Sequence, residues 1–160
     1  MRAIAVIATI TCGVLLAGLV ACSASDDPVV SVSSDDPEMN AAIAEARESL
    51  PAFWMVYGAP NRGESDFALK VRIEDRRAVE HFWVTDLRRE ADKVYGLIGN
   101  QPNTVTTVKL GDEIEVPSDD ITDWLYMRDG KMAGNFTLRP LFKEMPVEEV
   151  ERLKAMMADP

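Results

Sequence analysis

The Asp129-Gly130 dipeptide constrains the fold of this chain more than any other feature of its sequence. It lies between residues 122–127 and 132–137, two runs of strand-forming residues. Asp-Gly supplies the positive φ angles that a two-residue type I′ turn requires, and it is the strongest short-range signal for a β-hairpin. The sequence therefore predicts an antiparallel strand pair in which Arg128 faces Lys131.

This register divides the predicted hairpin into two faces, because side chains alternate along a strand. One face is mixed aromatic and polar, with Trp124 opposite Asn135, Thr122 opposite Thr137, Tyr126 opposite Ala133, and Arg139 following on the same parity. The other is mostly apolar, with Leu125 opposite Gly134, Met127 opposite Met132, and Asp123 opposite Phe136. We predict that the apolar face packs on the core and that the Trp124 face is partly exposed to water. A shift in register by one residue would exchange the two faces.

The partly exposed face is the predicted ligand-binding site, formed by Trp124, Asn135, Thr137 and Arg139. An aromatic platform beside an amide, a hydroxyl and a guanidinium suits a peptide, a carboxylate or a sugar. A second interpretation stays open, in which Trp124 covers a minor core and Arg139 pairs with Asp120 or Asp123.

The first 21 residues have the pattern of a secretory signal, with Arg2 followed by an apolar run. The run ends Leu19-Val20-Ala21-Cys22, followed by Ser23, which resembles the lipobox of bacterial lipoproteins. The resemblance implies cleavage before Cys22 and three lipid chains on that residue, a stable anchor where one chain is marginal. The same resemblance implies a location, because a residue such as Ser23 rather than Asp after the Cys favours the outer membrane of a Gram-negative cell, with the domain facing the periplasm. The alternative is an uncleaved membrane anchor, because the run is nearly long enough to span a bilayer.

Charge and cysteine content limit the possible functions. The chain has a formal net charge of −10, and it becomes one unit more negative if Arg2 leaves with the signal. Such a surface repels phosphate backbones, so we expect no nucleic-acid partner. Cys12 would also leave with the signal, so the mature domain keeps no thiol other than the lipidated one. With a single histidine besides, zinc lacks ligands, and we predict no metal and no cofactor.

The rest of the chain is predicted to form a flexible tether (residues 22–35, rich in Ser and Asp) and one domain (residues 36–160). Asp36 predicts a helix N-terminus, and a buried stripe follows at Met39, Ile43, Ala46 and Leu50 on a helix that stops before Pro51. For residues 53–57 the sequence does not distinguish a strand from irregular structure. Strands are predicted over 66–74, 79–85 and 93–98, at 114–116, and through the hairpin until Pro140 closes the last one.

Pro146 opens a final helix with an apolar stripe at Val150, Leu153 and Met157 and an ion pair between Glu148 and Arg152. The predicted fold class is therefore α+β, with an antiparallel sheet or small open barrel and a helix at each end.

Six sequence segments follow one another in an order that resembles a known bacterial family: FALKVRIED, EHFWV, YGLIGNQP, GDEIEVP, DDITDWLYMRDGK and GNFTLRPLF. Together they resemble the domain of unknown function 2314 over roughly residues 37–142. This resemblance implies a shared fold and brings no established activity or catalytic residue. Residues 96–124 also resemble a related immunity-protein domain found beside bacterial toxins.

A few single residues could form a catalytic or metal site. His81 is the one histidine and could act as a general base, but no serine lies in a recognisable nucleophile motif, so a structural imidazole is favoured. Asp119, Asp120 and Asp123 could hold Ca²⁺, but their spacing is not that of an EF-hand, and a turn is favoured. The possibility that two carboxylates form a site for glycoside hydrolysis also stays open.

We therefore predict a lipid-anchored cell-envelope domain that binds another molecule without catalysis, with the membrane as one partner through Cys22 and a protein or peptide as the other. The alternatives are a carboxylate-dependent hydrolase assisted by His81 and an immunity-like protein that binds a toxin through its acidic surface.

Overall fold

The computed structural model describes residues 36–76 and 78–158, so the predicted signal, Cys22 and the tether lie outside the described residues. The elements follow in this order: α1 (Pro37–Gly58), β1 (Glu64–Glu74), β2 (Val79–Glu90), β3 (Lys93–Ile98), β4 (Glu113–Glu115), the 3₁₀ segment η1 (Ser118–Asp120), β5 (Ile121–Arg128), β6 (Lys131–Gly134), the 3₁₀ segment η2 (Phe136–Glu144) and α2 (Val147–Met156). Within this part of the chain, no helix has the length and apolar character needed to cross a membrane.

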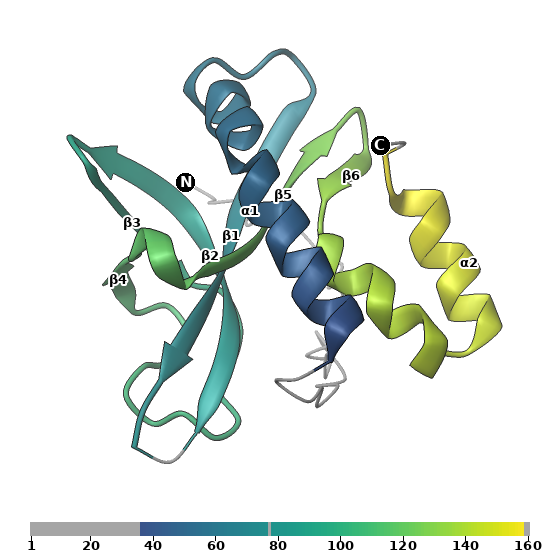
Figure 1. The fold of residues 1–160 in the computed structure, drawn as a ribbon. Helices are drawn as coiled ribbons and strands as arrows, with labels where there is room; N and C mark the ends of the chain where they lie inside the picture. The colour runs from purple at the N-terminus through teal and green to yellow at the C-terminus, as the bar shows by residue number, and fades with distance from the viewer. Residues whose placement is uncertain (1–35, 77, 159–160) are drawn as a thin grey trace, which may run out of the picture.

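The six strands form one open antiparallel sheet in the order β4-β3-β2-β1-β5-β6. In Figure 1, α1 lies across the sheet, and α2 lies beyond β6. The predicted α+β class with a helix at each end is confirmed. The strand predicted over residues 93–98 is β3, and β2 continues five residues beyond the predicted Thr85 to Glu90.

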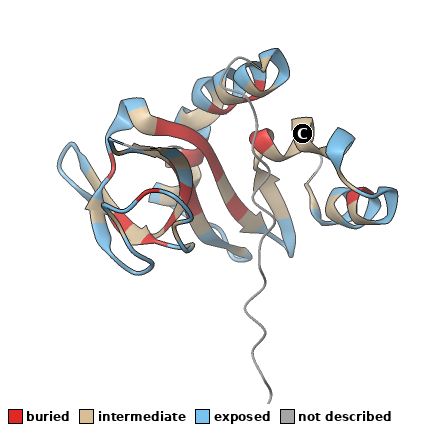
Figure 2. Cartoon of the chain, turned by 90° about the horizontal axis from the view of Figure 1, so that it is seen from below, coloured by how far each residue is buried: buried red, intermediate tan, exposed pale blue. Residues whose placement is uncertain are grey.

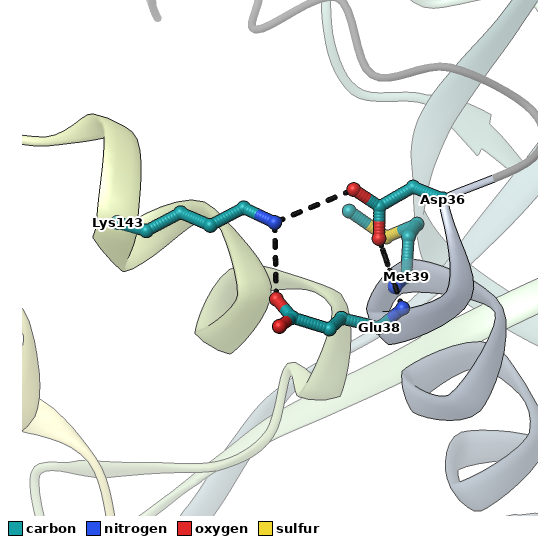
Figure 3. Close-up of polar contacts among 4 residues, drawn as sticks. All are labelled: Asp36, Glu38, Met39 and Lys143. Carbon is teal, nitrogen blue, oxygen red and sulfur yellow. Dashed lines mark hydrogen bonds and ion pairs between the residues drawn. The ribbon is translucent and has the colours of Figure 1, made fainter.

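The N-terminus of α1 is capped as predicted. The Asp36 carboxylate accepts hydrogen bonds from the backbone N–H groups of Glu38 at 2.9 Å and Met39 at 3.0 Å. Lys143 of η2 reaches the same corner, with its Nζ 3.4 Å from Asp36 and 3.0 Å from Glu38 (Figure 3). The point at which the predicted tether would join the domain is therefore tied to η2.

The prediction that the first helix stops before Pro51 is wrong, because α1 continues through Pro51 to Gly58. Proline removes one backbone donor from the helix interior, which is usually costly. Here the residues after Pro51 offset that cost, because Phe53 is 0% exposed and its ring lies 5.6 Å from that of Trp124. Residues 53–57, left open from the sequence, are therefore helical.

The hairpin register is confirmed, but its two faces are exchanged. Four predicted pairs occur, from Arg128↔Lys131 to Leu125↔Gly134. Trp124 is nevertheless only 7% exposed and Tyr126 only 4%, so the face predicted to be partly exposed to water packs in the core. The reason lies in the neighbouring strands, because Trp124 pairs with Leu69 of β1, which pairs in turn with Val84 of β2.

The last strand also ends earlier than predicted. Positive φ angles at Gly134 (82°) and Asn135 (51°) turn the chain out of the sheet after β6. The chain then enters η2, which contains Pro140 inside it, so the predicted pairs of Thr122 with Thr137 and Asp123 with Phe136 do not form. In the final helix, Arg152 pairs with Glu149 at 2.5 Å instead of the predicted Glu148.

An aromatic cluster between α1 and the sheet forms the centre of the core, and buried residues run along the middle of the sheet in Figure 2. Phe53 contacts the rings of Trp54, Tyr57, Phe67, Trp124 and Tyr126. The Trp124 indole N–H donates to the Ala46 carbonyl at 3.0 Å and to the Ser49 hydroxyl at 3.2 Å. We call this side of the sheet the inner face.

One acidic side chain secures the long loop between β3 and β4. The Glu80 carboxylate accepts hydrogen bonds from the backbone N–H groups of Asn103, Thr104 and Val105, at 2.8, 2.9 and 2.7 Å. Desolvation raises the pKa of Glu80, but these three donors outweigh it, and the net shift is below the ordinary value of 4.5.

We expect Glu80→Gln to lower the free energy of unfolding at pH 7 by about 1 kcal/mol, because an amide oxygen accepts these bonds less strongly than a carboxylate. Glu80 is more acidic when folded, so its contribution is complete above pH 4.5 and is lost as the pH falls through the lowered value. Urea unfolding of both proteins at pH 7 and pH 3 measures this. A gap between them that did not shrink in acid would contradict the assignment.

Candidate functional site

The side of the sheet opposite α1 carries the candidate site. Cross-strand pairs place Lys70 beside Trp83 and Arg72 beside His81, where β1 and β2 meet in the middle of the sheet. Leu97 of β3 pairs with Thr85, which lies on the same side as Trp83, and Tyr95 follows on the same parity. We define the outer face by six residues: Lys70, Arg72, His81, Trp83, Tyr95 and Leu97.

Rings and aliphatic groups occupy the centre of the outer face. Trp83, Tyr95 and Leu97 are all partly exposed, and His81 is exposed. Lys70 Nζ lies 5.3 Å from the centre of the Trp83 ring, and the Arg88 guanidinium lies 4.8 Å from that of Tyr95. These cations are held over aromatic rings, which orders both partners of each pair.

Ion pairs surround this aromatic centre. Arg72 pairs with Glu74 at 2.5 Å, Arg88 with Glu113 at 2.9 Å, and Lys93 with Glu115 at 2.7 Å. Their side chains are 40–58% exposed, so each pair contributes at most about 1 kcal/mol to stability. The fold therefore does not depend on them, and their charges are accessible from solvent.

His81 stays neutral at physiological pH. Desolvation of its ring and the positive charges of Lys70 and Arg72 lower the pKa of His81 to about 4. Desolvation is the larger cause of this lowered pKa, and the repulsion between an imidazolium and the two cations adds to it. The centre of the outer face is therefore a place of positive potential.

A polar network connects the outer face to the interior. Lys70 Nζ donates to the Thr137 hydroxyl at 2.9 Å, and that hydroxyl donates to the Asp123 carboxylate at 2.7 Å. Asp123 is 0% exposed and also accepts from the backbone N–H groups of Trp124 (2.8 Å), Phe136 (3.1 Å) and Thr137 (2.7 Å). The negative end of the network is buried, and its positive end lies on the outer face.

The four residues predicted to form the binding site do not share one surface. Trp124 and Thr137 are buried, which agrees with the second interpretation of Trp124 as a core residue. The Asn135 amide N–H donates to the Met132 sulfur at 3.3 Å. The Arg139 guanidinium lies 4.8 Å from the centre of the Phe136 ring and, within the described residues, makes no ion pair with Asp120 or Asp123.

Asp119 and Asp120 lie in η1, a turn as the sequence predicts. Arg47 of α1 donates to the backbone carbonyl of Ile121 at 2.8 Å and to that of Asp119, which holds η1 against the helix. In the part of the chain that the structure describes, no group of three His, Cys, Asp or Glu residues is placed to hold a metal ion.

Comparison with known proteins identifies the family. The family model described as "Uncharacterized protein conserved in bacteria (DUF2314)" matches residues 36–157. The chain belongs to the DUF2314 family. The resemblance inferred from the sequence segments is thereby confirmed.

Two relatives of this DUF2314 protein are informative. The "Uncharacterized protein YegJ" of Escherichia coli (strain K12) is 36% identical over 132 residues, which cover 82% of this chain and 84% of that protein. The "Putative ankyrin repeat protein NMB1133/NMB1171" of Neisseria meningitidis serogroup B is 32% identical over 132 residues, which cover 78% of this chain and 52% of that protein. No solved structure matches.

Sequence reasoning missed the outer face of this DUF2314 domain, although a signal for it was present. The strand predicted over residues 66–74 places Lys70 and Arg72 on its polar parity, and His81 shares its parity with Trp83 in the next strand. Pairing those two strands would have brought the four residues together. The site was predicted on the hairpin instead, because its Asp-Gly turn is the stronger local signal.

Proposed function

We propose that this protein is a lipid-anchored domain of the bacterial cell envelope that binds another protein through the outer face of its sheet. One observation carries the binding role: the outer face has an aromatic centre surrounded by exposed ion pairs, while α1 lies on the opposite face. Residues such as Trp83 and Tyr95 supply most of the binding energy in protein interfaces, and charged residues form the rim around them.

The hydrolase alternative has less support. An acid–base mechanism with His81 needs a carboxylate to orient the imidazole or to share the proton transfer. The charged groups that act on His81 are instead the cations Lys70 and Arg72. An immunity-like role is one form of the binding proposal, because such proteins act by occupying a partner.

The Neisseria relative also favours binding. Its printed name is that of a putative ankyrin repeat protein, and ankyrin repeats in general present extended binding surfaces. We extend a recognition function from that name to this chain as part of the proposal.

The proposed anchor rests on Leu19-Val20-Ala21-Cys22 at the end of an apolar run. Expressed at full length in a Gram-negative cell, the protein is expected to begin at Cys22, to carry labelled palmitate and to sediment with the outer membrane. Cys22→Ser should abolish the labelling and leave the signal uncleaved. Mass spectrometry of an intact Met1 N-terminus on the unsubstituted protein would contradict the anchor.

Site-specific photo-crosslinking in living cells tests the binding role. Val79 lies on the parity of His81 and Trp83 and is 46% exposed, whereas Met55 on α1 is 72% exposed and provides the matched control. A photoreactive side chain at Val79 should give a discrete protein adduct that the same group at Met55 does not give. Equal yields at the two positions, or no adduct at Val79, would contradict binding through the outer face.

A further inference from the structure

We infer that the outer face binds an extended acidic segment of its partner protein, with a partner carboxylate between Lys70 and Arg72 and a neighbouring apolar side chain on Trp83. This inference rests on the proposed function and adds the chemistry of the partner. The inference follows from the contrast between the net negative charge of the whole chain and the positive charges at the centre of the outer face.

The chain has a net charge of −10, yet the charges at the centre of the outer face are positive. Lys70 and Arg72 are separated by one residue on β1, so both side chains leave the same side of the strand. His81 and Trp83, their cross-strand partners on β2, add no negative charge, and Asp123, the partner of Lys70 on β5, is 0% exposed. The exposed glutamates Glu74, Glu113 and Glu115 lie at the margins of this face, in the surrounding ion pairs.

Both Lys70 and Arg72 can bind a carboxylate of a partner protein. The Arg72 side chain is 40% exposed, and its Glu74 partner is 58% exposed. An exposed pair of this kind is worth at most about 1 kcal/mol, so a partner carboxylate can replace or join Glu74 on the guanidinium. Lys70 is held in place by the Thr137 hydroxyl and the Trp83 ring, so little side-chain entropy is lost when its ammonium meets an anion.

The neighbouring aromatic rings indicate that the ligand is an extended segment with an apolar side chain near its carboxylate. Trp83 lies next to Lys70 across the strand pair, and Leu97 and Tyr95 continue the apolar surface along β3. An extended segment presents alternate side chains to one side, so one residue can reach the cations while another two positions away covers Trp83. The acidic remainder of the domain repels acidic proteins that lack this fit, which favours specificity.

Three labelled nine-residue peptides provide the test. In the first, Glu and Leu alternate at every second position with Ser between them, so that both residue types share one side of the extended chain. The second has Gln for Glu, and the third has Lys for Glu. Each is titrated by fluorescence anisotropy against the full-length protein in neutral detergent micelles. We expect the Glu peptide to bind at least about tenfold more tightly than the Gln peptide, a difference of about 1.4 kcal/mol, and to weaken as salt is added. The Lys peptide should bind least.

Arg72→Gln should remove most of the preference for the Glu peptide, and Trp83→Ala should weaken the Glu and Gln peptides alike. Lys131→Gln, an exposed cation on β6 outside the outer face, is the matched control and should change nothing. Arg72 is the primary variant because Lys70 also touches the buried network and its loss could disturb folding.

Equal affinity for the Glu and Gln peptides, or an Arg72→Gln protein that keeps the preference, would overturn the inference. Binding to vesicles of phosphatidylglycerol in place of the peptides would overturn it too, because the face would then contact lipid. A Val79 adduct without a preference for the acidic peptide leaves the proposed function standing and removes only the partner chemistry. Absence of the adduct removes both.

Discussion

Replacing Phe53 with alanine is expected to lower the free energy of unfolding by about 3–5 kcal/mol. The ring is 0% exposed, and it contacts five other aromatic rings at centroid distances of 5.0 to 6.4 Å. Truncation removes its transfer free energy and leaves a cavity between α1 and the sheet that rigid rings cannot close. This loss is a large share of the roughly 5–15 kcal/mol that stabilises a typical domain.

Urea unfolding of the full-length protein in detergent, followed by far-ultraviolet circular dichroism, measures this loss. Met55→Ala is the control, because Met55 lies two residues away on the same helix and is 72% exposed. It should change the free energy of unfolding by less than about 0.5 kcal/mol. Equal midpoints for the two variants would show that α1 does not pack against the sheet through Phe53.

Replacing Asp123 with alanine is expected to cost about 3 kcal/mol or more, because its buried carboxylate accepts four hydrogen bonds within the protein. The substitution leaves the N–H groups of Phe136 and Thr137 without their acceptor in a place from which water is excluded. It also removes the anchor that turns the chain from β6 into η2. We therefore expect η2 to loosen together with the loss of stability.

Hydrogen exchange of the η2 amides and urea unfolding should both report the change. Asp119→Ala removes an exposed carboxylate in η1, four residues earlier, and should leave both measurements within about 0.5 kcal/mol of the unsubstituted protein. Asp123→Asn keeps the volume and one acceptor oxygen, so its effect should lie between the two. A fully stable Asp123→Ala protein would mean that the hydrogen bonds to this carboxylate do not hold η2.

Local sequence rules predicted the features that local chemistry determines. Asp129-Gly130 set the register of the hairpin, Asp36 capped α1, and residues 93–98 formed β3. Each depends on contacts within a few residues. The assignment of faces failed because it depends on β1 and β2, which pair Leu69 with both Trp124 and Val84 and so draw the Trp124 side into the core.

The candidate site was missed for the same reason, because the sequence shows which residues share a side of each strand but not which strands pair. Lys70 and Trp83 are thirteen positions apart in the sequence, and only the pairing of β1 with β2 brings them together. Pro51 gives another example, because its local preference to end a helix is overridden by the burial of Phe53. Tertiary packing determines which side of the hairpin is buried, which strands pair and where α1 ends. The residue pattern of a single strand or helix does not contain this information.

The central claim is that the inner face holds the fold together and the outer face binds a partner, and Trp83→Ala tests it most directly. Two quantities are measured on this variant in the full-length protein: the free energy of unfolding and the yield of the Val79 crosslinked adduct. We predict a loss of stability below about 1 kcal/mol, because Trp83 is only partly buried, together with a loss of most of the adduct. A variant that unfolds as readily as Phe53→Ala, or that keeps the full yield of adduct, would contradict the claim.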